Sequence, residues 1–296
     1  MDNRDQRIGN WERFIILEDN KASLAHFLST EISESYSAPP GRELVINGGF
    51  KDTLKVWSSD TSRQDIRELA SDHEEADTRI VLHARDVAAR GYKQVNILCR
   101  DTDVLVLLLA HREQLCQEIW MFVGTSRQRR YIPVHRIPLS EEKRKSLLAF
   151  HAITGCDTTS QFYGEGKASE WKVFEDAPDL LEHLGEESQI TADVLAKAEA
   201  FVCKLYNPGT NLVPRALFPA PWGRGCPGTQ EVEINKELAA AFRESKKDLD
   251  ALPRAPTQDA LILHIKRANY QTMVWNKALE PCPSLPKPED SGWYYE

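Results

Sequence analysis

The sequence predicts an α/β fold in which helices flank a mainly parallel β-sheet. Segments with strand and helix periodicity alternate between residues 71 and 153, which is typical of such a layered fold. Apolar residues make up 41 % of the 296-residue chain, enough for a sizeable core. No apolar run approaches the roughly 20 residues that a membrane-spanning helix needs, so we expect no membrane partner.

The charge and the cysteines restrict the class of protein. The formal net charge of −8 argues against a generally basic nucleic-acid-binding protein, although it is compatible with a local basic surface. The six cysteines form no C-x-x-C pair, which indicates reduced thiols. Because the polar residues 1–9 do not resemble a signal peptide, we expect an intracellular protein of the nucleus or cytoplasm.

The first 60 residues predict one helix and a pair of strands. Apolar positions at helical spacing indicate an amphipathic helix from about residue 20 to residue 32. Residues 43–47 and 53–57 have apolar, strand-like centres, and Gly48-Gly49 between them is typical of a turn.

A helix is predicted next, over residues 71–90. Ser71 and Glu74 have the spacing of a capping box, in which each side chain satisfies an amide at the start of the helix. Gly91 ends this helix, and residues 95–99 are expected to form a buried strand.

The alternation of strands and helices then continues. We expect a helix over residues 104–115, with Asp103 as its N-cap residue, and another helix over residues 141–153. Between them, residues 119–123 and 130–134 have the composition of strands.

We expect three parts along the chain. An α/β domain covers residues 1–206, a disordered insertion covers 207–230, and a helical carboxyl-terminal region with a flexible tail covers 231–296. The insertion is rich in proline and glycine, a composition that does not carry regular structure. Helical periodicity is expected outside the insertion over residues 171–206, 231–247 and 257–279.

Acidic residues gather at three element boundaries. The carboxylates are Glu75 and Asp77 at a helix start, Asp101 and Asp103 after a strand, and Asp157 after a helix. Carboxylates that converge from separate elements supply the hard oxygen ligands that Mg²⁺ prefers. Because ligands of parallel sheets bind beyond the carboxyl ends of the strands, we expect these residues to meet at one metal site.

Each acidic cluster also has a purely structural interpretation. Acids such as Glu75 and Asp77 in the first turn of a helix interact favourably with the helix dipole. Asp101 and Asp103 have the positions of turn and N-cap residues, and Asp157 could cap a turn with the threonines that follow it.

Other polar and aromatic residues have a favoured structural interpretation as well. The arginines and lysines between residues 127 and 145 could contact phosphate groups, but a solvated surface is the favoured interpretation. We expect His151 and Cys156 in the core. Trp275 and Tyr270 on the last helix are interpreted as core anchors in preference to base-stacking residues.

The ordered set of motifs resembles the flap-endonuclease branch of the PIN-like nuclease superfamily. Members have an acidic pair at a helix start, Asp-x-Asp after a strand, and Gly-Cys-Asp after a helix, followed by a glycine-rich turn. Here these correspond to Glu75-Ala76-Asp77, Asp101-Thr102-Asp103, Gly155-Cys156-Asp157 and Gly164-Glu165-Gly166-Lys167. The resemblance covers roughly residues 70–170, and the chain is also similar to animal proteins of this type that are associated with mobile elements.

The resemblance implies a PIN-like fold and hydrolysis of phosphodiester bonds in DNA or RNA with Mg²⁺ or Mn²⁺, at a site with two ions. By position, the implied catalytic and metal-binding residues are Glu75, Asp77, Asp101, Asp103 and Asp157, and the implied nucleic-acid-binding residues are Gly164, Gly166 and Lys167. The family begins with a strand that carries a further aspartate. Nothing before residue 70 matches it, which implies an amino-terminally truncated product. The alternative is a catalytically inactive remnant that binds nucleic acid or protein.

Overall fold

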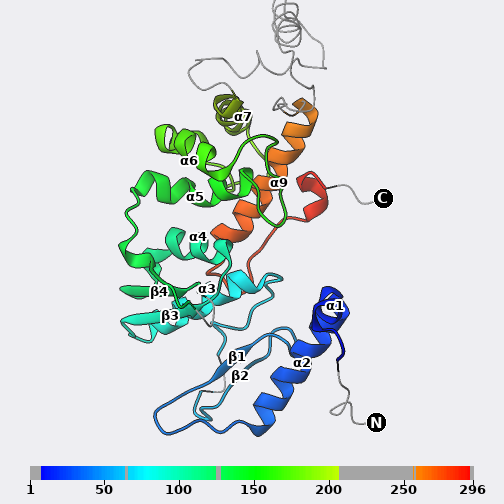
Figure 1. Cartoon of the computed structure of the whole chain (residues 1–296), viewed down its shortest axis with the longest axis vertical. Helices are drawn as coiled ribbons and strands as arrows, with labels where there is room; N and C mark the ends of the chain where they lie inside the picture. Colours follow the sequence, from blue (N-terminus) through cyan, green and yellow to red (C-terminus); the bar gives the residue numbers. More distant parts are fainter. Residues whose placement is uncertain (1–7, 64–65, 125–127, 207–255, 257, 294–296) are drawn as a thin grey trace, which may run out of the picture. The chain divides into compact units, whose positions relative to one another are not determined.

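The computed structural model describes residues 8–63, 66–124, 128–206, 256 and 258–293, and over them the chain has a mixed α/β fold (Figure 1). The chain divides into two compact units. The first comprises residues 1–92 and 278–283, and the second comprises residues 93–277 and 284–296. The division after residue 92 falls inside the domain expected over residues 1–206. The insertion expected at 207–230 and the helix expected at 231–247 lie outside the described residues.

The first unit contains helices and one two-stranded antiparallel sheet. In chain order its elements are α1 (Trp11–Ile16), α2 (Glu18–Ser35), β1 (Val45–Asn47), β2 (Val56–Ser58) and α3 (Ala76–Ala89). The predicted pair of strands is therefore confirmed, and Ile46 pairs with Trp57 at its centre. A small core of Ile66, Leu69 and Leu82 packs beneath the hairpin. Each of these three side chains is almost fully buried.

Helix α3 begins five residues later than predicted, because the preceding backbone bonds to other parts of the first unit. The Ser71–Glu74 capping box is wrong: Glu75 occupies the N-cap position. The Arg79 guanidinium donates to the carbonyl of His73 through Nε at 2.9 Å, and the amide of Asp72 donates to Pro281 O at 3.3 Å. These bonds hold the residues before the helix in an extended path.

The second unit contains the longer sheet and most of the helices. Its strands and α-helices are β3 (Gln94–Leu98), α4 (Thr102–Ala110), β4 (Glu118–Phe122), β5 (Tyr131–Pro133), α5 (Glu141–Ile153), α6 (Lys167–Asp176), α7 (Ala192–Tyr206) and α9 (Gln258–Asn276). Short 3₁₀ helices are η2 (Arg112–Gln114), η3 (Val134–Arg136), η4 (Pro178–Leu181) and η7 (Pro288–Ser291).

The sheet of the second unit has the order β3-β4-β5 and mixed strand directions. Strands β3 and β4 run parallel, joined by α4, whereas β5 pairs antiparallel with β4. A mainly parallel sheet was expected, whereas over the described residues this sheet contains one parallel and one antiparallel strand pair. The difference arises because β5 begins at Tyr131, so soon after β4 ends at Phe122 that the chain between them is too short for a parallel crossover.

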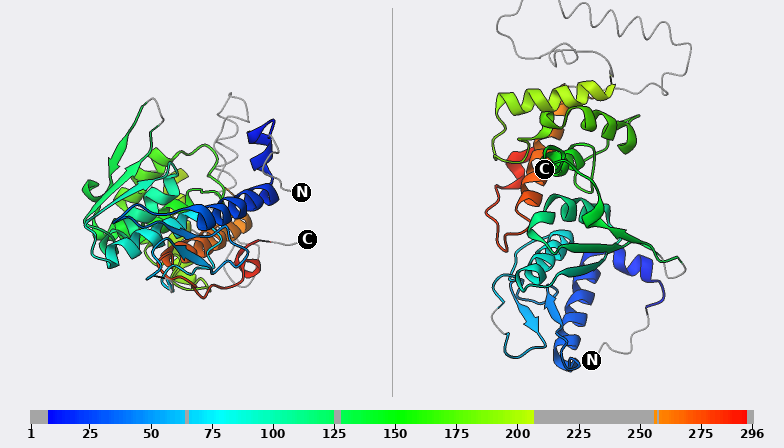
Figure 2. Two further views of the ribbon diagram at one scale, coloured as in Figure 1. Left: turned by 90° about the horizontal axis from the view of Figure 1, so that it is seen from below. Right: turned by 90° about the vertical axis from the view of Figure 1, so that its left-hand side faces the viewer.

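Helices α4 and α9 both pack on α5 in the core of the second unit (Figures 1 and 2). Leu261, Ile265 and Trp275 of α9 are fully or almost fully buried, which confirms the predicted helix and the role of Trp275 as a core anchor. The carboxyl-terminal segment returns to this helix: the Trp293 ring lies 5.4 Å from that of Tyr270. Ser291 and Gly292 are buried beside this contact. The flexible tail expected at the end of the chain stays a prediction.

Candidate metal site at the end of strand β3

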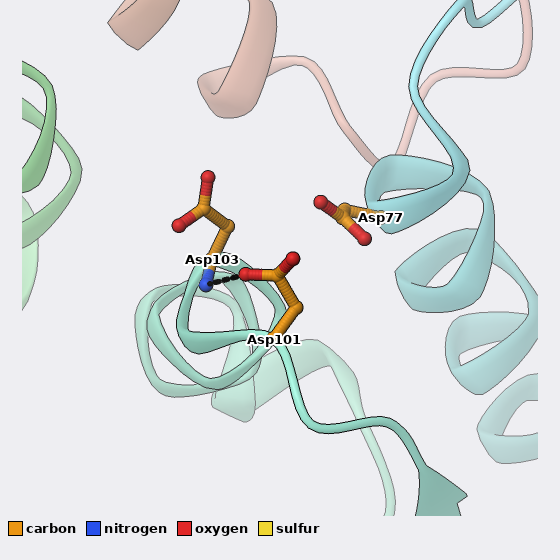
Figure 3. A group of neighbouring side chains, drawn as sticks. All are labelled: Asp77, Asp101 and Asp103. Atoms are coloured by element: carbon orange, nitrogen blue, oxygen red, sulfur yellow. Dashed lines mark hydrogen bonds between the residues drawn. The ribbon is translucent and has the colours of Figure 1, made fainter. Parts of the chain in front are cut away.

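Asp101 follows β3 and is the N-cap residue of α4. Its side-chain Oδ1 accepts a hydrogen bond of 3.0 Å from the amide of Asp103 (Figure 3). This bond satisfies one of the amides left without a partner at the start of the helix. The N-cap residue was predicted to be Asp103, whereas in the structure it is Asp101. The prediction that one of these two acids caps the helix is confirmed.

Asp103 lies in the first turn of α4 and contacts a histidine of α5. The Nε2 atom of His151 lies 2.8 Å from Asp103 Oδ1, and both side chains are largely shielded from solvent. The imidazole also stacks against Trp275, with 5.5 Å between ring centroids. His151 is buried, as predicted for a core residue, yet it also orients a candidate metal ligand. Sequence reasoning missed this second role.

Lys167, at the start of α6, bonds to the interior of the second unit. Its ammonium group donates to Thr154 Oγ1 at 2.6 Å and Gly155 O at 2.8 Å, and it lies 3.4 Å from Nδ1 of His151. Burial lowers the pKa of Lys167, an effect that Glu170, Cys156 and Asp103 partly oppose. A phosphate group at this lysine would have to displace one of these internal acceptors.

Two carboxylates of the second unit stand in one helical turn. Asp101 and Asp103 are the N-cap residue and a first-turn residue of α4, and the bond between the Asp103 amide and Asp101 Oδ1 joins them (Figure 3). Carboxylate oxygens of this kind fit a hard divalent cation. Asp77 lies in the first turn of α3 in the first unit, and its role as a ligand stays a prediction.

The remaining acids predicted as ligands are Glu75 and Asp157. Glu75 is the N-cap residue of α3. Asp157 is exposed at the tip of a tight turn, which is closed by two backbone hydrogen bonds between Cys156 and Thr159. The turn is anchored at Thr159, whose hydroxyl donates to Ala152 O at 2.6 Å. Ligation by Glu75 or Asp157 stays a prediction.

The glycine-rich segment before α6 contains both candidate phosphate-binding glycines. Gly164 has a φ of 82°, a conformation that residues with a side chain rarely adopt, and Gly166 is the N-cap residue of α6. The amide of Gly166 is 3.2 Å from Ser169 Oγ and donates to it. Phosphate binding by these glycines and by Lys167 likewise stays a prediction.

Glu170 is a buried acid that sequence reasoning did not single out. Its side chain is only 1 % exposed, and neither carboxylate oxygen has a hydrogen-bond partner among the described residues. Burial raises the pKa of Glu170 to about 7, despite the opposing charge of Lys167. Burial likewise raises the pKa of Tyr206 to about 12, with a contribution from Glu165 and Glu170.

Comparisons with protein-family models, with curated proteins and with solved structures found no match. Over the described residues, every helix is too short or too polar to cross a lipid bilayer. The cysteines of the described part of the chain are unpaired thiols, namely Cys99, Cys116, Cys156, Cys203 and Cys282.

Proposed function

We propose that the chain is a divalent-metal-dependent nuclease that hydrolyses phosphodiester bonds of DNA or RNA. The observation that carries this proposal is the pair of carboxylates, Asp101 and Asp103, on the first turn of α4 just beyond the end of β3. Both are oxygen donors at the edge of a sheet where ligands of α/β proteins commonly bind. The resemblance of the surrounding motifs to PIN-like nucleases supports phosphodiesters as the substrate class.

The surroundings of the two aspartates are compatible with a ligand role. A carboxylate has about four lone-pair positions, so the cap bond of Asp101 and the histidine bond of Asp103 leave room for a metal ion. His151 fixes the orientation of Asp103, as the outer partners of metal ligands commonly do. Lys167 in turn lies against the other nitrogen of the same imidazole.

The proposed ion is Mg²⁺ or Mn²⁺, held by Asp101 and Asp103 at the start of α4. When bound, such an ion activates a water molecule and stabilises the charge on the leaving oxygen of a phosphodiester. Two carboxylates leave the other positions around the ion to water and substrate oxygens, as is usual for Mg²⁺. A second ion, as the resemblance implies, would need further ligands, for which Glu75, Asp77 and Asp157 are the candidates in the sequence.

The test is to titrate the full chain with Mn²⁺ by calorimetry and to assay cleavage of labelled DNA and RNA. We expect Asp101→Asn and Asp103→Asn each to weaken Mn²⁺ binding by at least about tenfold and to abolish cleavage, because each removes a charged ligand. Asp176→Asn, which changes an exposed aspartate at the end of α6, is the matched control and should behave like the wild type. Cleavage that persists in EDTA, or in both variants, would refute the proposal.

A second candidate is a non-catalytic module that binds nucleic acid or protein. It is favoured by the exposed position of Asp157 and by the internal hydrogen bonds of Lys167, because both residues belong to the expected catalytic surface. Mn²⁺ binding without turnover on any DNA or RNA substrate would support this candidate. Measurable turnover that is lost in Asp101→Asn would exclude it.

A further inference from the structure

The sheet of the second unit has one buried face and one open face. Ile97, Ile119 and Met121 point to the buried face and are at most 7 % exposed. On the other face, β3 presents Leu98, which is 79 % exposed, and β5 presents Tyr131, which is 52 % exposed. The open face therefore displays large apolar side chains that the fold of this unit does not cover.

These apolar residues form a continuous row across the sheet. Leu98 of β3 pairs with Phe122 of β4, and Phe122 pairs with Tyr131 of β5. Residues directly opposite one another in a sheet have side chains on the same face. The Phe122 and Tyr131 rings lie 5.2 Å apart, so the two aromatic side chains are in contact. We call the row of Leu98, Phe122 and Tyr131 the apolar row.

The composition of the open face changes along the strands. At the amino end of β3 and β4 this face carries the polar residues Gln94 and Glu118. In the middle, Asn96 pairs with the partly buried Trp120, whose ring packs against His135. The apolar row lies at the opposite, carboxyl end, where β3 leads directly into Asp101. An open sheet face is usually polar throughout, so a gradient of this kind indicates a binding surface at the carboxyl end.

Exposed arginines flank the same end of the sheet. Arg100 follows β3, and Arg129 and Arg130 come directly before β5. All three are exposed, in a chain whose net charge is −8. A local positive charge beside aromatic rings is complementary to a phosphate backbone with unpaired bases.

We propose that the apolar row and its flanking arginines bind single-stranded nucleic acid, with bases stacked on Phe122 and Tyr131. Open sheet faces with aromatic side chains are suited to unpaired bases, because every base has a π-face and stacking needs no particular sequence. The inference deepens the proposed function, on which it rests for the identity of the ligand. It identifies the substrate as a single strand that passes over the end of β3 toward Asp101.

The test measures the anisotropy of labelled single-stranded oligo-dT, oligo-U and a duplex, all in EDTA, so that no metal ion is needed for binding. We expect the full chain to bind the single strands more tightly than the duplex, with an affinity that falls as salt rises. Tyr131→Ala should weaken single-strand binding by about tenfold, as is typical of the loss of one stacked base, and Tyr131→Phe should retain it.

Two further variants keep the test decisive. Leu98→Glu changes a side chain that is 79 % exposed, so it should leave the fold intact while repelling the phosphate backbone and weakening binding at least about threefold. Tyr36→Ala changes an exposed tyrosine of the first unit, after α2, and should have no effect.

Several outcomes would overturn the inference. They are equal affinity for duplex and single strand, unchanged binding in both Tyr131→Ala and Leu98→Glu, or a wild-type dimer that Leu98→Glu dissociates without any oligonucleotide binding. The last outcome would identify the apolar row as a protein interface. The binding assay contains no metal ion. Single-strand binding by a chain that does not bind Mn²⁺ would therefore refute the proposed nuclease function and leave the binding surface at the apolar row standing. Metal-dependent cleavage with unchanged oligonucleotide affinity in the variants would refute only the apolar row.

Discussion

The imidazole of His151 connects Asp103 to Lys167. Its Nε2 lies 2.8 Å from the carboxylate, and its Nδ1 lies 3.4 Å from the lysine ammonium. The three residues come from the first turn of α4, the last turn of α5 and the first residue of α6. This connection makes the orientation of a candidate metal ligand depend on the packing of three helices.

Loss of the histidine should weaken metal binding even though it is not a ligand. We expect His151→Ala to reduce the affinity for Mn²⁺ by about 10- to 100-fold, the usual cost of removing an outer partner of a metal ligand. His264→Gln is the control, because this histidine is also buried and its Nε2 lies 2.7 Å from Ile153 O. Calorimetric titration gives both affinities. Unchanged Mn²⁺ binding in His151→Ala would contradict the orienting role.

The buried Glu170 should make the protein less stable as the pH rises. Its pKa is raised in the folded state to about 7 from an ordinary value of 4.5. Below pH 4.5 the carboxyl is protonated in both states and carries no penalty. Between about pH 4.5 and pH 7 the unfolded chain ionises first, so the free energy of unfolding falls with pH, by an amount on the order of 3 kcal/mol.

Glu170→Gln tests this dependence, because the amide has a similar shape and does not ionise. We expect the variant to lose less stability than the wild type between pH 5 and pH 8, as measured by urea unfolding at about those two values. Glu175→Gln, at an exposed position of the same helix, should follow the wild type. Parallel pH profiles for the wild type and Glu170→Gln would show that the carboxyl is not the cause.

Gly185 should tolerate no side chain. Its φ is 88°, and a Cβ atom added there would lie 2.4 Å from Thr272 Cγ2 of α9. Gly91→Ala is a matched control, since Gly91 has a similar φ of 84° and nothing within 4 Å of an added Cβ. We expect a loss of about 1–2 kcal/mol for Gly91→Ala from backbone strain alone, and a loss larger by about 1–3 kcal/mol for Gly185→Ala. Thermal unfolding of the two variants gives the difference, and equal losses would contradict the steric argument.

Two leucines of the second unit should differ sharply in their contribution to stability. Leu107 of α4 is fully buried, whereas Leu98 of β3 is 79 % exposed. Leu107→Ala should lower the free energy of unfolding by about 2–5 kcal/mol, because it leaves a cavity in the core. Leu98→Ala should change it by about 0.5 kcal/mol or less. Urea unfolding measures both, and a similar cost at the two positions would mean that α4 is not part of the core.

The helices and strands could be predicted where the apolar residues follow a regular period and a residue that favours the end of an element, such as an N-cap residue, stands beside them. Helix α5 begins at Glu141 and ends at Ile153, as predicted, because Ser140 caps its first turn and apolar residues repeat along one side. Strands β3 and β4 were also placed within one residue at each end. The start of α3 was wrong because its capping signal at Ser71 competes with bonds from Asn47, Arg79 and the carboxyl-terminal segment, which no local pattern reveals.

The candidate site was predictable in part. The proximity of Asp101 and Asp103 follows from the sequence, because both lie in one turn after a strand. The contact of Asp103 with His151 could not be predicted from the local sequence, because it joins residues 48 positions apart. The only available signal was a histidine within the buried helix α5, which needs a polar partner wherever it packs. The apolar row was equally hidden, because it depends on the register of three strands.

The first unit includes residues 278–283 from near the other end of the chain. The carbonyl groups of Leu279, Glu280 and Pro281 bond to Arg85, His73 and Asp72. During synthesis on the ribosome, these acceptors emerge only after residues 93–277 of the second unit have been made. We therefore expect the first unit to stay incompletely assembled until most of the second unit has been translated, and a message cut short before residue 278 to yield a product in which the first unit lacks these bonds.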